Sequence, residues 1–137
     1  MLVWTPGASA VQVLLASGGS GFSQVAPVVG SSFDVPIGIV DVNDDGKPDL
    51  IYGGGGDNSR PISVRAGNGA GGFGSQILSS GMSVTAYMGT ADFNGDGKLD
   101  LVASAVGGSS NTVAVLTGDG TGLFTLKSSF VVGQGSI

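Results

Sequence analysis

The chain has 137 residues, enough for one domain of ordinary size, and it contains neither His nor Cys. This composition excludes disulfides, thiolate or imidazole metal sites, Cys nucleophiles and every His-dependent catalytic triad. The net charge is −5, and only five Lys and Arg residues are scattered along the chain, so no basic patch for nucleic acid is expected.

Glycine dominates the composition, with 27 residues, and all the acidic residues are Asp. Helix is unfavourable in such a chain, because Gly interrupts it every few residues and good surface helix formers are scarce. The apolar runs are three to five residues long, which suits strands and is too short for a transmembrane helix. Residues 1–6 do not have the pattern of a signal peptide. We therefore expect an all-β protein and no membrane partner.

An internal repeat organises the chain. A shift of 51 residues carries the segment 41–51 onto 92–102, with seven of eleven positions identical. The same shift relates the three phenylalanines that follow Gly-rich turns, Phe22, Phe73 and Phe124. A repeat of this length predicts a modular architecture in which similar units stack on one another.

In chain order, the repeat predicts a partial unit over 1–34, a complete unit over 35–85 and another over 86–137. The partial unit begins at an expected strand over 2–4, so we expect it to lack its innermost strand and the acidic loop that follows. The middle unit reads as four short strands separated by turn residues. We place them at Pro36–Asp41, Asp49–Tyr52, Ile62–Ala66 and Gln76–Ser79.

Four antiparallel strands in about 50 residues, repeated, are typical of a β-propeller blade. A β-sandwich of similar strands is the alternative. About 2.7 repeats cannot close a ring, because propellers need typically 4–8 blades. We therefore expect either several copies of the chain to assemble, with a two-chain six-bladed ring as the simplest closed form, or missing parent sequence to complete the ring. A short open stack with capped ends is a third possibility.

Two loops, 41–49 and 92–100, carry the pattern D-x-N-x-D-G-x-x-D. Ca²⁺ prefers six to eight oxygen ligands, and ligands at loop positions 1, 3, 5 and 7 surround it while Gly at position 6 permits the turn. The carboxylate at position 9 closes each loop, and the position 7 ligand is a backbone carbonyl. The predicted ligands of two Ca²⁺ sites are Asp41, Asn43, Asp45, Lys47 and Asp49, then Asp92, Asn94, Asp96, Lys98 and Asp100.

The alternative is that these are ordinary turn residues in a hairpin. A turn needs one or two such residues, whereas acids at positions 1, 5 and 9 repel one another unless a cation is present. Mg²⁺ is smaller and retains its waters, so Ca²⁺ is preferred. Two bound Ca²⁺ ions change the net charge from −5 to −1, and their removal is expected to destabilise the fold.

The segment 91–102, followed by 113–116 and the Gly-Phe turn at 118–124, resembles an FG-GAP (VCBS-type) repeat, the calcium-binding blade of integrin α-subunit propellers and of many bacterial extracellular proteins. The resemblance implies a propeller with Ca²⁺ between the two inner strands of each blade, in a secreted or cell-surface setting. The middle unit departs from the family pattern at Val42, Asp44 and Pro48, none of which is a predicted side-chain ligand. The family includes adhesion modules, lectins and domains attached to enzymes.

We expect a non-enzymatic binding module, with a lectin that binds glycans as one possibility. Trp4, Tyr52 and Tyr87 are the aromatic residues with polar groups, and their alternative role is packing between blades. The loop 53–59 and its counterpart 104–111 are either a recognition surface or exposed connectors. A structural fragment of a larger adhesion protein, or of the accessory domain of an enzyme, is the alternative function.

Catalysis is not expected from the remaining acids. Outside the two loops the only carboxylates are Asp34, Asp57 and Asp119, and no two of them form a recognisable acid and base pair. The expected macromolecular partner is a further copy of the same chain, because exposed blade faces need to be covered.

Overall fold

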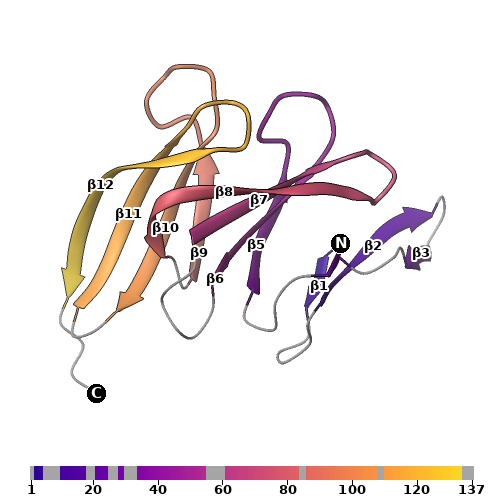
Figure 1. Ribbon diagram of the computed structural model, residues 1–137, viewed down its shortest axis with the longest axis horizontal. Helices are drawn as coiled ribbons and strands as arrows, with labels where there is room; N and C mark the ends of the chain where they lie inside the picture. The colour runs from indigo at the N-terminus through magenta and orange to yellow at the C-terminus, as the bar shows by residue number, and fades with distance from the viewer. Residues whose placement is uncertain are drawn as a thin grey trace.

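The computed structural model describes residues 2–4, 10–17, 21–24, 28–29, 34–54, 61–83, 86–107 and 110–133. Every regular element in these ranges is a β-strand, and they contain no helix able to cross a membrane. The strands form three antiparallel sheets, which lie side by side in Figure 1 with the middle sheet between the other two. The predicted all-β class is confirmed.

The middle sheet is a meander of β5 (Asp34–Val40), β6 (Asp49–Gly54), β7 (Pro61–Gly67) and β8 (Phe73–Ser83), in that order. These are the four strands predicted for this unit. The last strand is longer than the predicted Gln76–Ser79, because its ladder with β7 continues past two irregularities in register, between Pro61 and Ser63 and between Arg65 and Gly67.

The C-terminal sheet repeats this arrangement. It consists of β9 (Ala86–Ala91), β10 (Asp100–Gly107), β11 (Ser110–Gly118) and β12 (Phe124–Gly133), again with sequence neighbours paired in space. Each acidic loop joins the first strand of its sheet to the second. The second strand begins at the last Asp of the loop in both sheets, which fixes the loops at the same edge of each unit.

The N-terminal sheet consists of β1 (Leu2–Trp4), β2 (Ala10–Ser17), β3 (Gly21–Gln24) and β4 (Val28–Val29). β3 and β4 pair with successive parts of β2, its residues 14–17 and 10–11 respectively. They therefore share the place beside β2 that one continuous strand, β8 or β12, takes in the other two sheets.

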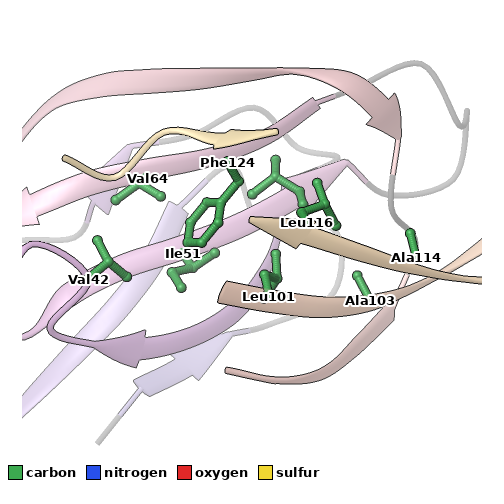
Figure 2. Packing of buried hydrophobic residues seen from close by; sticks show 9 residues of the cluster. Val42, Ile51, Val64, Leu101, Ala103, Ala114, Leu116 and Phe124 are labelled. Atoms are coloured by element: carbon green, nitrogen blue, oxygen red, sulfur yellow. The ribbon is translucent and has the colours of Figure 1, made fainter. Parts of the chain in front are cut away.

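A cluster of buried hydrophobic residues lies between the middle and C-terminal sheets (Figure 2). Both sheets contribute to it: Val42, Ile51, Ile62 and Val64 come from the middle unit, and Leu101, Ala103, Ala114, Leu116 and Phe124 from the C-terminal unit. Phe124 is 1% exposed. The core is thus an interface between repeats, as expected when blades stack.

The opposite face of the middle sheet is buried as well. Leu50 and Tyr52 point away from that cluster by strand alternation and are 0% and 3% exposed, and Val13 of the N-terminal sheet is 2% exposed. Burial on both faces distinguishes this stack from a two-layer sandwich, in which each sheet has one solvated face. The three sheets are therefore arranged as propeller blades.

Candidate metal centre

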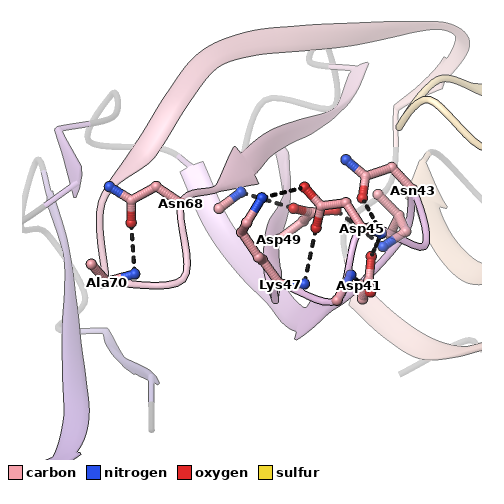
Figure 3. Close-up of polar contacts among 10 residues, drawn as sticks. Asp41, Asn43, Asp45, Lys47, Asp49, Asn68 and Ala70 are labelled. Carbon is pink, nitrogen blue, oxygen red and sulfur yellow. Dashed lines mark hydrogen bonds and ion pairs between the residues drawn. The ribbon is translucent and has the colours of Figure 1, made fainter.

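The first acidic loop, residues 41–49, is held by hydrogen bonds from its own backbone (Figure 3). The amide of Asp45 donates to both the Asp41 Oδ1 and the Asn43 Oδ1 at 3.1 Å, so these two side-chain oxygens converge on one nitrogen. The amide of Gly46 donates to Asp41 Oδ2 at 2.7 Å, and the amide of Lys47 donates to Asp45 Oδ1 at 2.9 Å. The oxygens at positions 1, 3 and 5 are thus folded back over the loop.

The second loop, residues 92–100, repeats this geometry. The amide of Asp96 donates to Asp92 Oδ1 at 3.2 Å and to Asn94 Oδ1 at 2.8 Å. The amide of Gly97 donates to Asp92 Oδ2 at 2.8 Å, and the amide of Lys98 donates to Asp96 Oδ1 at 2.9 Å. Two loops that differ at three positions therefore share these four hydrogen bonds.

Left-handed backbone conformations make this compact loop possible. Gly46 and Gly97, at position 6, have φ of 80° and 83°. Position 4 is also left-handed, with Gly95 at 78° and Asp44 at 58°. Asp is one of the few non-glycine residues that adopt this region readily. The replacement of Gly by Asp at position 4 therefore leaves the loop conformation unchanged.

The Asp at position 9 has a role that the sequence did not reveal. Asp49 is 0% exposed. Its Oδ2 accepts a hydrogen bond from the amide of Val42 at 3.0 Å, and its Oδ1 accepts one from the amide of Gly67 at 2.8 Å. The carboxylate therefore connects the start of the acidic loop to the end of β7.

The C-terminal unit has the same connection. Asp100, also 0% exposed, accepts from the amide of Phe93 at 3.0 Å and from the amide of Gly118 at 3.0 Å. A β-carbon on Gly67 or Gly118 would overlap the carbonyl of Pro48 or Leu99, so only glycine allows this close approach. The sequence signal for this connection is that Gly67 and Gly118 are themselves separated by one repeat.

The donor chemistry of each loop suits a hard cation. At its predicted ligand positions each loop carries three carboxylates and one side-chain amide oxygen, the ligand types that Ca²⁺ takes. A carboxylate oxygen that accepts one hydrogen bond retains a second lone pair. Among the described residues, however, no three acidic side chains lie close enough together to form a group that holds a metal ion. The position 9 carboxylates in particular are directed at backbone amides.

The loop amides also stabilise the charged form of the acids. The pKa of Asp45 lies below its ordinary value of 3.8, chiefly because the Lys47 amide donates to the carboxylate. The pKa of Asp92 is lowered as well, and the largest cause is the hydrogen bond from the Gly97 amide. The Lys47 ammonium lies 3.2 Å from the Asp45 Oδ2, as an exposed ion pair.

The Gly-rich turns before the phenylalanines are capped by a polar side chain at the same repeat position. In the middle sheet, Asn68 Oδ1 accepts from the amides of Ala70 and Gly72 at 2.8 and 2.9 Å. In the C-terminal sheet, Asp119 Oδ1 accepts from the amide and the hydroxyl of Thr121 at 2.8 and 2.7 Å. Asp119 is therefore a turn residue. Asp57 and the side chain of Asp34 lie outside the described part of the structure.

Of the three aromatic residues predicted as possible sugar contacts, only Tyr52 has a side chain that the structure describes. Tyr52 is 3% exposed, and its hydroxyl accepts a hydrogen bond from Arg65 Nε at 3.0 Å, so it packs between blades. The side chains of Trp4 and Tyr87 lie outside the described residues, as do positions 55–59 and 108–109 of the two segments predicted as loops. The loop prediction was wrong for residues 53–54, 104–107 and 110–111, which are strand residues because the ladders of β6, β10 and β11 extend into them.

A groove of about 550 Å³ runs between the two acidic loops. One wall is formed by the first loop and the other by the second loop with the neighbouring Gly-rich turn. The polar residues that line it are Asp41, Asn43, Asp44, Lys98 and Asp119.

Comparisons with known proteins agree with this geometry. A model of the FG-GAP-like repeat matches residues 41–103, and a model of the FG-GAP repeat matches residues 88–121. The two matches together contain both acidic loops. Neither the curated proteins nor the solved structures give a significant match. Residues 41–121 of this chain are therefore repeats of the FG-GAP type.

Proposed function

We propose that the chain is a non-enzymatic, propeller-like binding module of the adhesion type, and that its two acidic loops bind Ca²⁺. FG-GAP repeats suggest such a module. The observation that carries the calcium proposal is the repetition of one loop geometry at positions 41–49 and 92–100. In both loops the oxygens at positions 1 and 3 converge on the amide at position 5.

The residues that would hold the ion are the same in both loops. Side-chain oxygens at positions 1, 3 and 5 and the carbonyl at position 7 supply the ligands, with Gly at position 6 in the left-handed conformation that the turn needs. The carboxylate at position 9 joins them through lone pairs that its two backbone hydrogen bonds leave available. Two ions would change the net charge from −5 to −1, which lowers repulsion among the six carboxylates at the ligand positions.

Calcium would act as a structural element in this proposal. Each loop links the first two strands of a sheet, and its last Asp is fixed to the end of the third strand. An ion bound in the loop would therefore stabilise three strands at once. Binding to the folded chain alone adds about 2.7 kcal/mol per site to the unfolding free energy at a hundredfold excess over the dissociation constant.

Thermal unfolding of the full chain, with Ca²⁺ and then with a chelator, tests this role. We expect a higher melting temperature in Ca²⁺, a smaller increase in Mg²⁺, and a reduced calcium-induced increase in Asp41→Asn and Asp92→Asn. Asp44→Asn is the matched control. It removes one charge from the same loop at a position that is not a ligand, and Asn tolerates its φ of 58°.

Two outcomes would refute the calcium role. One is a melting temperature that chelation does not change. The other is an equal loss of the calcium-induced increase in Asp44→Asn and in Asp41→Asn, because this would show that net charge, and not ligation, accounts for the effect.

A carbohydrate ligand is the second part of the proposal, and the groove between the loops supports it. Sugars are bound by small polar groups that hydrogen-bond to their hydroxyls, and the groove presents carboxylate, amide and ammonium groups from two neighbouring blades. A glycan screen with the wild-type chain and with Lys98→Ala tests the idea. Binding that Lys98→Ala retains unchanged would place the sugar elsewhere, and no binding would reject it.

The cellular setting follows from the same family. FG-GAP repeats are typical of extracellular proteins, where calcium is plentiful. We propose a secreted or cell-surface location, and detection of the native protein in the extracellular fraction would support it.

A further inference from the structure

The interface between the middle and C-terminal sheets shows which residues one blade uses to cover the next. The middle sheet presents Val42, Ile51, Ile62 and Val64, which are at most 5% exposed. Ile51 and Val64 are partners in the β6–β7 ladder, so their side chains lie on the same face of the sheet.

The C-terminal sheet carries the equivalent face one repeat later, and no other described sheet packs on it. Val102, Val113 and Val115 stand 51 residues after Ile51, Ile62 and Val64, and they are only partly buried. Val42, which is 5% exposed, is replaced by Phe93, which is 52% exposed.

Phe130 extends this surface at the outer strand. It is the ladder partner of Val113, so it lies on the same face, and it is 57% exposed. We call this surface the C-terminal face; it is formed by Phe93, Val102, Val113, Val115 and Phe130. Exposed apolar surface of this kind marks an interaction site.

The complementary surface lies on the N-terminal sheet. Phe124 and Leu116 cover the middle sheet and are each 1% exposed. Two repeats earlier, their equivalents are Phe22 and Leu14. Phe22 is 57% exposed and Leu14 is partly buried. Leu14 and Phe22 form the N-terminal face.

We infer that the N-terminal face of one copy packs on the C-terminal face of a second copy and continues the interface seen between the middle and C-terminal sheets. Each face presents the repeat equivalents of one side of that interface. The same apolar groups that are buried inside the chain would become buried between chains, which is the driving force for association. This inference rests on the blade arrangement and does not depend on the proposed calcium role.

The two faces are different surfaces, so the contact is head-to-tail. Such a contact closes into a ring if the rotation between copies permits, and otherwise extends into a filament. It differs in a testable way from a symmetric dimer, in which one patch on each chain meets the same patch on the other.

Two variants distinguish these arrangements. Phe22→Asp places a charge in the N-terminal face, and Phe130→Asp places one in the C-terminal face. Leu78→Asp is the matched control, since Leu78 is also 57% exposed but lies on the outer strand of the middle sheet. Solution mass is measured by light scattering after size exclusion in calcium, with circular dichroism to verify that each variant is folded.

We expect the wild-type chain and Leu78→Asp to be oligomeric and each face variant to be monomeric. Mixing Phe22→Asp with Phe130→Asp should give a discrete one-to-one complex, because each chain keeps one intact face. This mixture also shows that both variants are folded, since an unfolded chain would not pair.

A monomeric wild-type chain would overturn the inference. So would a Phe22→Asp variant that stays oligomeric, because that result indicates a symmetric contact through the C-terminal face alone. Repeating the wild-type measurement with a chelator separates this inference from the calcium proposal. A wild-type chain that is monomeric in calcium although calcium raises its melting temperature refutes the association alone. A chain that is oligomeric with and without the chelator, and whose melting temperature does not respond to calcium, refutes the calcium role alone.

Discussion

The carboxylate of Asp49 accepts a hydrogen bond from the amide of Gly67, 18 residues further along the chain, at 2.8 Å. Its other oxygen holds the amide of Val42. One buried side chain therefore connects the acidic loop to the end of the third strand, and Asp100 does the same for Phe93 and Gly118. This pair of contacts makes the position 9 aspartates structural residues whether or not a cation is bound.

Replacing Asp49 or Asp100 with Asn should therefore destabilise the chain even in a chelator. The amide group of Asn is a donor, so one of the two backbone N–H groups loses its acceptor in a buried site. We expect a loss of about 2 kcal/mol in the unfolding free energy, measured by urea unfolding. If Asp49→Asn in chelator has the same unfolding free energy as the wild-type chain, the structural role of Asp49 is contradicted.

Gly67 and Gly118 should tolerate no side chain. A β-carbon at either position would overlap a backbone carbonyl, of Pro48 or Leu99, and neither strand end can move without breaking the contact to the buried Asp. We expect Gly67→Ala to cost about 3 kcal/mol in unfolding free energy. Gly38→Ala is the control, because a β-carbon there meets nothing within 4 Å. Equal unfolding midpoints for the two variants would refute this explanation.

Ser79 should stabilise the interface between two blades. Its hydroxyl accepts a hydrogen bond from the buried amide of Phe124 at 2.9 Å, across 45 residues of sequence. Ser79→Ala leaves that amide without an acceptor and should lower the unfolding free energy by about 1.5 kcal/mol. Ser75→Ala, at an exposed position in the same strand, should have almost no effect. The prediction fails if both serine variants unfold at the same denaturant concentration.

Acid should destabilise the chain through the loop aspartates. Asp45 and Asp92 have folded-state pKa values below the ordinary 3.8, so their stabilising contribution is present above that pH and is lost as the pH falls through the lowered values. In chelator, we expect the urea midpoint to be flat near neutrality and to fall below about pH 4. Asp92→Asn should show a shallower fall, and an identical pH profile would contradict the assignment.

Much of the fold could be predicted from the sequence, because the strands and turns of each unit recur at a fixed spacing along the chain. The shift that carries Asp41 onto Asp92 aligns strands and turns together, and β6 and β10 both begin at the last Asp of their loops. The fourth strand of the middle unit was predicted too short, since its extension to Ser83 depends on irregular pairing with β7. Pairing across an irregular register has no periodic signal in a single strand.

The contacts through space could not be predicted in the same way. The pattern indicated Asp49 as a closing ligand, but its hydrogen bond to Gly67 depends on how the third strand returns to the loop. Phe22 and Phe124 have the same repeat position, yet they are 57% and 1% exposed. Their exposed fractions differ because the middle blade covers Phe124, and the residues next to each Phe in the sequence do not show whether a blade covers it.

Calorimetric titration of the full chain with Ca²⁺ measures directly whether the two acidic loops bind the ion. We expect two bound ions per wild-type chain, one in Asp41→Asn or in Asp92→Asn, and two in the Asp44→Asn control. The absence of saturable binding in the wild-type chain would contradict the claim that its acidic loops are calcium sites.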